Sequence, residues 1–133
     1  AREGIPESVH ALKQRIKACD GVLLSTPEYN NGIPGVLKNA IDWLSRPAGE
    51  IPEIFGGRPV AVIGASPGGF GTILAQHAWL PVLRTLGTKP WFGARLMVSR
   101  AGQVFNLAGE MVDDKMRLQL QRFLLGFLAS LQH

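Results

Sequence analysis

Two short apolar runs that lack polar alternation constrain the fold of this chain more than any other feature. One run is 22–24, which reads Val-Leu-Leu, and the other is 59–63, which reads Pro-Val-Ala-Val-Ile. A strand that is apolar on both sides must be covered on both faces, which is typical of a parallel sheet flanked by helices. A third strand is expected within 91–98.

Helical patterns separate these strands. Apolar residues recur at intervals of three and four along 6–18, 34–46 and 73–87, and along a final segment that Asp113 precedes as a candidate N-cap. The apolar stripe predicted for the final helix consists of Met116, Leu120, Phe123, Leu124, Phe127, Leu128 and Leu131. Residues 46–58 are rich in Pro and Gly and are predicted to form a surface loop.

The resulting order of elements, helix-strand-helix-strand-helix-strand-helix, predicts an α/β fold. Parallel neighbours need a crossover the size of a helix, so helices are expected on both faces of the sheet. The 133 residues are expected to form a single domain, 1–133. Three strands make a thin sheet, and the first element is a helix, so we expect part of the domain to precede this sequence.

The composition argues against several classes of partner. The net charge of +4 comes from basic residues that are scattered singly, so no nucleic-acid surface is expected. No apolar run approaches the roughly 20 residues that span a bilayer, so no membrane partner is expected. His10, His77 and His133 lack the spacing of metal ligands, so no metal site is expected.

Cysteine usage bears on the compartment. Cys19 is the only cysteine, so an intrachain disulfide is excluded. A chain without disulfides suits a reducing compartment, and we expect a cytoplasmic protein.

Two loops of unusual composition follow the first two predicted strands. In open α/β sheets, ligands bind beyond the carboxyl ends of the strands. The first loop, 25–35, reads Ser-Thr-Pro-Glu-Tyr-Asn-Asn-Gly-Ile-Pro-Gly and offers an aromatic ring and several polar groups. The second loop, 64–72, reads Gly-Ala-Ser-Pro-Gly-Gly-Phe-Gly-Thr and exposes backbone N–H groups that suit the polar edge of a flat ring.

The second loop formally matches the Gly-x-Ser-x-Gly pattern of serine hydrolases. In that pattern, the backbone N–H of the residue after the serine helps to form the oxyanion hole. Here Pro67 follows Ser66 and has no N–H, which disfavours a hydrolase. No Lys-Ser/Thr pair follows the glycines, so a nucleotide-triphosphate loop is not supported either.

Three stretches of this sequence are similar to one family. They are Pro-Glu-Tyr-Asn at 27–30, Pro-Gly-Val-Leu-Lys-Asn-Ala-Ile-Asp-Trp at 34–43, and the glycine loop at 66–71. In these motifs the chain resembles the NADPH-dependent FMN reductases, which include quinone, chromate and azo reductases. The resemblance implies a flavodoxin-like three-layer sandwich with a parallel sheet, and it extends over almost the whole chain.

The resemblance also implies a site and a reaction. It places eight residues around the flavin ring of FMN: Pro27, Glu28, Tyr29, Asn30, Ser66, Gly68, Gly69 and Gly71. It implies that hydride passes from NADPH or NADH to the flavin and then to a quinone, a free flavin or an oxidised metal ion. No side chain is expected to be catalytic, because the cofactor carries the chemistry. A homodimer or homotetramer is implied.

The beginning of the chain departs from the family pattern. Family members open with a strand and a Ser-rich loop that grips the FMN phosphate, and nothing before Pro6 matches it. The first strand-helix-strand unit is therefore expected to be missing from this sequence. A non-enzymatic FMN-binding electron carrier is the alternative function. Electron carriers usually present an acidic docking face, whereas this chain is basic, which favours the enzyme.

Overall fold

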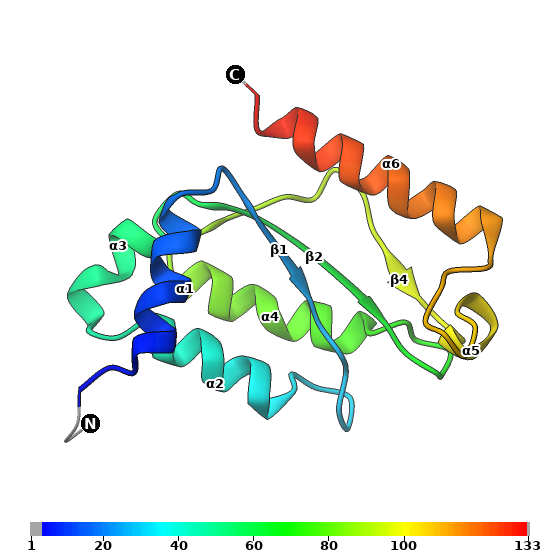
Figure 1. Ribbon diagram of the computed structural model, residues 1–133, viewed down its shortest axis with the longest axis horizontal. Helices are drawn as coiled ribbons and strands as arrows, with labels where there is room; N and C mark the ends of the chain where they lie inside the picture. Colours follow the sequence, from blue (N-terminus) through cyan, green and yellow to red (C-terminus); the bar gives the residue numbers. More distant parts are fainter. Residues whose placement is uncertain (1–3, 133) are drawn as a thin grey trace.

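The centre of the fold is a parallel sheet in which strand β2 lies between its neighbours (Figure 1). The computed structural model describes residues 4–132. Strand β1 (Val22–Ser25) pairs with β2 (Pro59–Ala65) over four residues, from Val22 opposite Val60 to Ser25 opposite Ile63. The other edge of β2 pairs with β3 (Lys89–Pro90) and β4 (Met97–Val98), and all these pairings are parallel.

Helices cover both faces of this sheet and create three layers. Four helices lie on one face: α1 (Glu7–Lys17), α2 (Gly35–Leu44), α3 (Ile51–Ile54) and α4 (Ile73–Thr85) (Figure 1). The long helix α6 (Asp114–Ser130) lies on the opposite face. The order of the elements and the parallel pairing confirm the predicted α/β sandwich.

Alternation along β2 divides the core between the two faces. Val60 is buried in a cluster with Leu24 of β1 and Trp79 of α4. The next residue, Ala61, is buried in a second cluster with Phe123 and Phe127 of α6. Successive side chains of a strand point to opposite faces, so one short run of sequence supplies both cores. The buried runs predicted from sequence are confirmed.

Helix α6 begins where the sequence predicted. The Asp113 Oδ1 atom accepts a hydrogen bond from the backbone N–H of Met116 at 3.0 Å, which makes Asp113 the N-cap. The predicted apolar stripe is correct at Phe123 and Phe127, which are buried. It was wrong at Leu128, whose side chain is 55% exposed because it lies on the solvent side of the helix.

The predicted third strand is interrupted. The Trp91 N–H still donates to the Val60 carbonyl of β2 at 2.8 Å, and the segment 92–95 then leaves the sheet. The backbone returns to β2 where the Gly64 N–H donates to the Leu96 carbonyl at 3.3 Å. The Trp91 ring, just before this segment, packs under α6 with its centroid 5.1 Å from that of Phe123.

The prediction of a surface loop over 46–58 was wrong. A 3₁₀ turn (Ala48–Glu50) and helix α3 occupy this segment, and Ile54 and Phe55 are buried. The Arg58 guanidinium fixes the end of α3, because its Nε donates to the Ile54 carbonyl at 3.0 Å. Two buried apolar residues in a Pro- and Gly-rich stretch are enough to fold it against α1 and α2.

Strand β1 forms one edge of the sheet. Within residues 4–132, no strand pairs with its outer side, and Leu23, which lies opposite Ala61 in the strand pairing and so points to the α6 face, is 41% exposed. A short helix that the sequence analysis missed, α5 (Ala101–Val104), follows β4. No helix in the described part of the chain is both long and apolar enough to cross a membrane.

The N-cap of α6 gives a test of this packing. Replacing Asp113 by Ala is expected to lower the free energy of unfolding by about 1 kcal/mol, because the Met116 amide loses its acceptor. Asp113→Asn retains an acceptor oxygen and is the matched control. Chemical denaturation of both variants measures the difference, and equal loss in the two would show that charge rather than capping is responsible.

Candidate functional site

The carboxyl ends of β1, β2 and β4 meet at one edge of the sheet, and the loops that follow them lie together there. Two backbone bonds tie the third of these loops to the second. The Ala101 N–H donates to the Ser66 carbonyl at 2.9 Å, and the Arg100 N–H donates to the Gly68 carbonyl at 2.8 Å. The edge at which ligands of open α/β sheets bind is thus built from three connected loops.

The first loop ends in a tight hairpin. The backbones of Tyr29 and Gly32 exchange two hydrogen bonds, at 3.0 and 3.2 Å. Between them, Asn30 and Asn31 both adopt left-handed conformations, with φ of 52° and 61°. Asn tolerates this conformation better than other residues with side chains, which explains the Asn-Asn-Gly sequence. The hairpin therefore fixes the backbone of Tyr29, from which its ring projects.

Two aromatic rings are exposed at this edge. Tyr29 of the first loop is 59% exposed and Phe70 of the second loop is 64% exposed. Large apolar side chains that remain uncovered beside polar loops commonly mark a binding surface. Both residues belong to the loops that the sequence analysis assigned to the site, and both were expected to shape the pocket for a flat ring.

Two glycines of the second loop have reasons within the chain itself. A Cβ atom at Gly64 would lie 2.0 Å from the Thr72 Oγ1 and 2.5 Å from the Thr26 carbonyl oxygen. Gly71 has a φ of +57°, and a Cβ there would lie 2.6 Å from the Met97 carbonyl. Packing therefore requires glycine at both positions.

The other two glycines of the loop lack such a reason. A Cβ atom at Gly68 or Gly69 would meet no heavy atom within 4 Å, and neither residue has a positive φ. Both are exposed to solvent. A side chain would fit at either position in the isolated chain, so packing within the chain does not require glycine there. The two consecutive glycines instead keep the space beside their backbone open.

Two side-chain bonds join the first loop to α4, the helix that follows the second loop. The Glu28 Oε1 atom accepts from the Ala75 backbone N–H at 2.7 Å. The Trp79 Nε1–H donates to the buried Thr26 hydroxyl at 2.9 Å. The two loops are therefore held at a fixed spacing through the first two turns of α4.

The residues predicted for the site divide into exposed and engaged groups. Pro27, Tyr29, Asn30, Gly68 and Gly69 are exposed at the common edge. Glu28 and Ser66 are partly buried, and Gly71 is fully buried against β4. The structure thus brings the two loops together as expected, while the role of each residue toward FMN remains a prediction.

Sequence reasoning missed Arg100, which follows β4 at the same edge. Its backbone is left-handed, with a φ of 49°, and its side chain is exposed. The rule that placed the first two loops at the site applies equally to the residues after the third strand. The expected third strand ended at residue 98, as β4 does, so the same rule would have identified Arg100.

The hydrolase reading of Ser66 finds no support in the local geometry. A nucleophilic elbow requires a sharp turn from strand directly into helix. Here α4 begins only at Ile73, after a loop that contains Pro67. Within residues 4–132, no three His, Cys, Asp or Glu side chains gather as a metal site would require.

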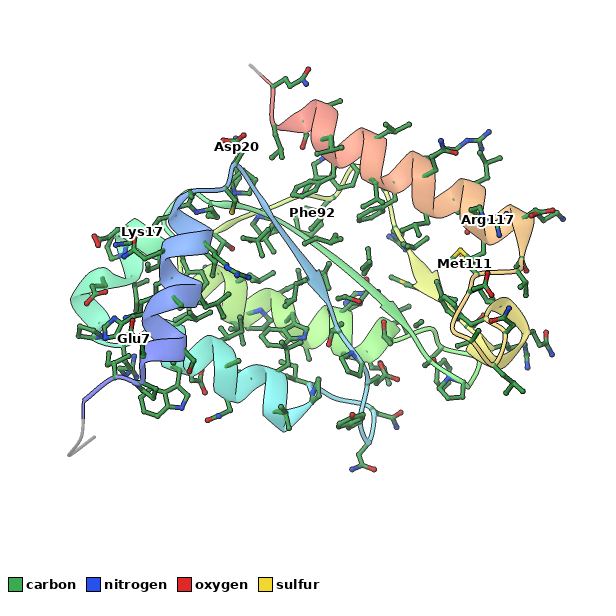
Figure 2. All side chains as sticks on the ribbon, viewed as in Figure 1. Glu7, Lys17, Asp20, Phe92, Met111 and Arg117 are labelled. Atoms are coloured by element: carbon green, nitrogen blue, oxygen red, sulfur yellow. The ribbon has the colours of Figure 1, made fainter. Side chains whose placement is uncertain are left out.

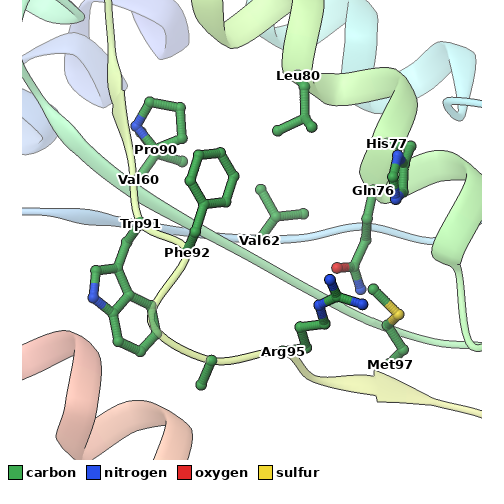
Figure 3. A pocket seen from close by; sticks show the side chains of 11 residues that line it. Val60, Val62, Gln76, His77, Leu80, Pro90, Trp91, Phe92, Arg95 and Met97 are labelled. Atoms are coloured by element: carbon green, nitrogen blue, oxygen red, sulfur yellow. The ribbon is translucent and has the colours of Figure 1, made fainter.

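A cavity of about 220 Å³ lies elsewhere, between α4 and the interrupted third strand (Figure 3). Figure 3 shows Phe92, Leu80 of α4 and Val62 of β2 around this cavity, with Arg95 beside Gln76. Among the described residues, the lining of this cavity includes none from the two loops. The cavity is therefore separate from the candidate site.

A family model described as NADPH-dependent FMN reductase matches residues 1–103 of the chain. The chain belongs to this family. Its similarity to individual members is substantial: it is 44% identical over 119 residues to an NAD(P)H-dependent FMN reductase of Pseudomonas aeruginosa. It is 40% identical over 119 residues to a 2-hydroxy-1,4-benzoquinone reductase of a Burkholderia species.

These two alignments cover 90% of the chain but only 63% and 64% of the relatives. The chain thus spans a little under two thirds of the length of these members of the family. Among solved structures, the flavoenzyme NAD(P)H:(acceptor) oxidoreductase FerB of Paracoccus denitrificans superposes with a TM-score of 0.84 at 39% identity. That superposition covers 97% of this chain and 70% of FerB, which confirms the flavodoxin-like fold.

The contrast between the glycines can be measured without any ligand. Gly64→Ala is expected to lower the free energy of unfolding by about 1–3 kcal/mol, because its Cβ overlaps buried backbone and the Thr72 hydroxyl. Gly68→Ala is the matched control and should change stability by less than about 0.5 kcal/mol, since the added methyl group meets open space. Thermal unfolding of both variants tests the assignment, and comparable losses would contradict it.

Proposed function

We propose that this protein is an NAD(P)H-dependent, FMN-containing reductase that passes electrons to a quinone, a free flavin or an oxidised metal ion. The observation that carries the proposal is the open backbone at Gly68 and Gly69, beside two exposed aromatic rings at the carboxyl edge of the sheet. The names of the family and of its members agree with it.

The residues present fit the flat ring of FMN. Two glycines leave their backbone open to close approach by a planar group, as a ring with polar edges requires. The exposed rings of Tyr29 and Phe70 offer apolar contact beside it. We propose that the ring lies between the hairpin of the first loop and the backbone of the second, with Pro27, Glu28, Asn30, Ser66 and Gly71 forming its surroundings.

Bound FMN would supply the redox chemistry, by taking a hydride from NAD(P)H and releasing electrons to the acceptor. The residues of the chain bind and orient. The backbone of the second loop fixes the ring edge, and the Tyr29 ring limits which acceptors fit beside it. No side chain of the two loops is assigned a proton-transfer step, in keeping with a reaction that the cofactor performs.

The non-enzymatic electron carrier remains the second candidate. The net charge of +4 favours the enzyme. A basic protein attracts the anionic NAD(P)H, whereas an electron carrier usually has an acidic surface that attracts basic partner proteins. A carrier would bind FMN but would not be reduced rapidly by a nicotinamide. The two candidates therefore predict different results in one measurement.

The visible absorption spectrum of the purified protein tests the proposal. Flavin bands are expected, either as purified or after addition of FMN, and they should bleach when NADPH or NADH is added without oxygen. Binding of FMN without bleaching would favour the carrier. Absence of any FMN binding would contradict both candidates.

Tyr29→Ala tests the role given to the first loop. The side chain is largely exposed, so stability should change by less than about 0.5 kcal/mol. The ratio of kcat/KM between a small and a bulky quinone should shift by about tenfold, because the ring that limits the acceptor space is gone. Leu107→Ala, an exposed residue outside the three loops, is the control. An unchanged ratio in Tyr29→Ala would refute the assignment.

We also propose that the protein is a cytoplasmic homodimer or homotetramer. Leu118 and Leu125 lie two turns apart on the same side of α6 and are 45% and 59% exposed, which supports a contact with a second copy through this helix. NAD(P)H is a cytoplasmic reductant, and Cys19 is a free thiol. Light scattering during size-exclusion chromatography measures the mass, and a monomer at micromolar concentration would contradict the assembly.

A further inference from the structure

We propose that Glu28 is a positioning residue that caps α4 from the opposite loop and thereby sets the spacing of the two loops of the site. The inference rests on the proposed function, because it concerns how the chain prepares the space for FMN. It assigns to Glu28 a bond to the protein backbone and not a contact with the reacting atoms.

The start of α4 lacks the cap that its own sequence offers. The first N–H groups of a helix have no partner within the helix, and a Ser, Thr, Asp or Asn just before it usually provides one. Thr72 holds that place, but its backbone is left-handed, with a φ of 70°, and its side chain makes no capping bond. Its hydroxyl instead accepts from the Gln76 Nε2 at 3.1 Å.

Thr72 is held in this role by its surroundings. Its side chain is fully buried, and its hydroxyl fills the space above Gly64 that a Cβ atom would occupy. The Gln76 amide that it accepts from also donates to the Leu96 carbonyl at 3.0 Å. The hydroxyl is therefore committed to the core, and the amides at the start of α4 need another acceptor.

Glu28 supplies that acceptor from a distance of 47 residues along the chain. Its Oε1 atom accepts the hydrogen bond at 2.7 Å from the Ala75 nitrogen. Ala75 is fully buried. A buried amide that loses its acceptor costs about 1–3 kcal/mol, so the bond holds the loop against the helix.

The charge of Glu28 is also matched by the helix. Among the ion pairs within residues 4–132, none involves Glu28. The positive end of the α4 dipole is then the partner of the carboxylate, which favours an anion at this place. Glu28 therefore interacts with α4 in two ways, through the hydrogen bond to the Ala75 N–H and through the attraction between its charge and the helix dipole.

Two attachment points give the first loop a defined orientation. The Trp79 indole holds Thr26, and the Ala75 amide holds Glu28, both from α4. Tyr29 follows directly and opens the hairpin. Without the Glu28 bond, Thr26 is still held by the Trp79 indole and by the Ile63 carbonyl. No side chain between Thr26 and the hairpin is then held by α4, so the hairpin and the Tyr29 ring can move relative to Gly68 and Gly69. Loss of the bond should weaken FMN binding because the ligand must then order the loop.

Binding of FMN to the ligand-free protein, followed by quenching of FMN fluorescence, tests the proposal. Glu28→Ala should raise the Kd of FMN by about tenfold, whereas Glu28→Gln, which keeps an acceptor oxygen, should remain within about threefold of wild type. Glu53→Ala removes an exposed carboxylate on α3 and is the matched control for the loss of charge.

Hydrogen exchange of the Ala75 amide provides a second readout that needs no flavin. It should exchange about tenfold faster in Glu28→Ala than in wild type, with protection restored in Glu28→Gln. Equal FMN affinity in wild type and Glu28→Ala would overturn the proposal, as would a Glu28→Gln protein that binds no better than Glu28→Ala. If wild type itself fails to bind FMN, the proposed function fails, even where the exchange data confirm the cap.

Discussion

Burial of β2 on both faces is the constraint on which the rest of this structure depends. Its side chains enter the core on the α4 side and the core on the α6 side in alternation, beginning with Val60 and Ala61. Every layer therefore packs on a single seven-residue strand. Because β2 also pairs along both edges, it fixes the register of its neighbours and so brings the carboxyl ends of the strands to the same edge of the sheet. The loops that follow the strands are brought together for this reason, and the candidate site is a consequence of the central strand.

The sequence predicted those parts of the fold that follow from local periodicity. The runs at 22–24 and 59–63 became strands, and Asp113 became the N-cap of α6. The failures occurred where tertiary packing overrides local composition. Two buried apolar residues, Ile54 and Phe55, pack a stretch rich in Pro and Gly against the helices, and the third strand is interrupted directly after Trp91, whose ring packs under α6. Neither effect can be read from periodicity, because each depends on a surface that another part of the chain provides.

The site was predictable to a similar extent. The positions of the two loops followed from the rule for open α/β sheets, and the resemblance of their motifs led to the family that the comparisons confirm. Sequence did not distinguish among the glycines. Gly64 and Gly71 are required by the packing of the chain, whereas Gly68 and Gly69 leave open space beside the backbone. Only the three-dimensional structure distinguishes these two roles of glycine. Likewise, the bond between Glu28 and Ala75 joins positions 47 residues apart, which no local pattern reveals.

The interruption of the third strand has a consequence for how copies of the chain meet in solution. An edge strand with a long row of free N–H and C=O groups can add a strand from another molecule and start aggregation. Strands β3 and β4 have two residues each, and the 92–95 segment between them turns away from the sheet (Figure 2 labels Phe92 within it). This edge offers no continuous template to an incoming chain. The interruption of the third strand thus also protects the sheet against unwanted growth in that direction.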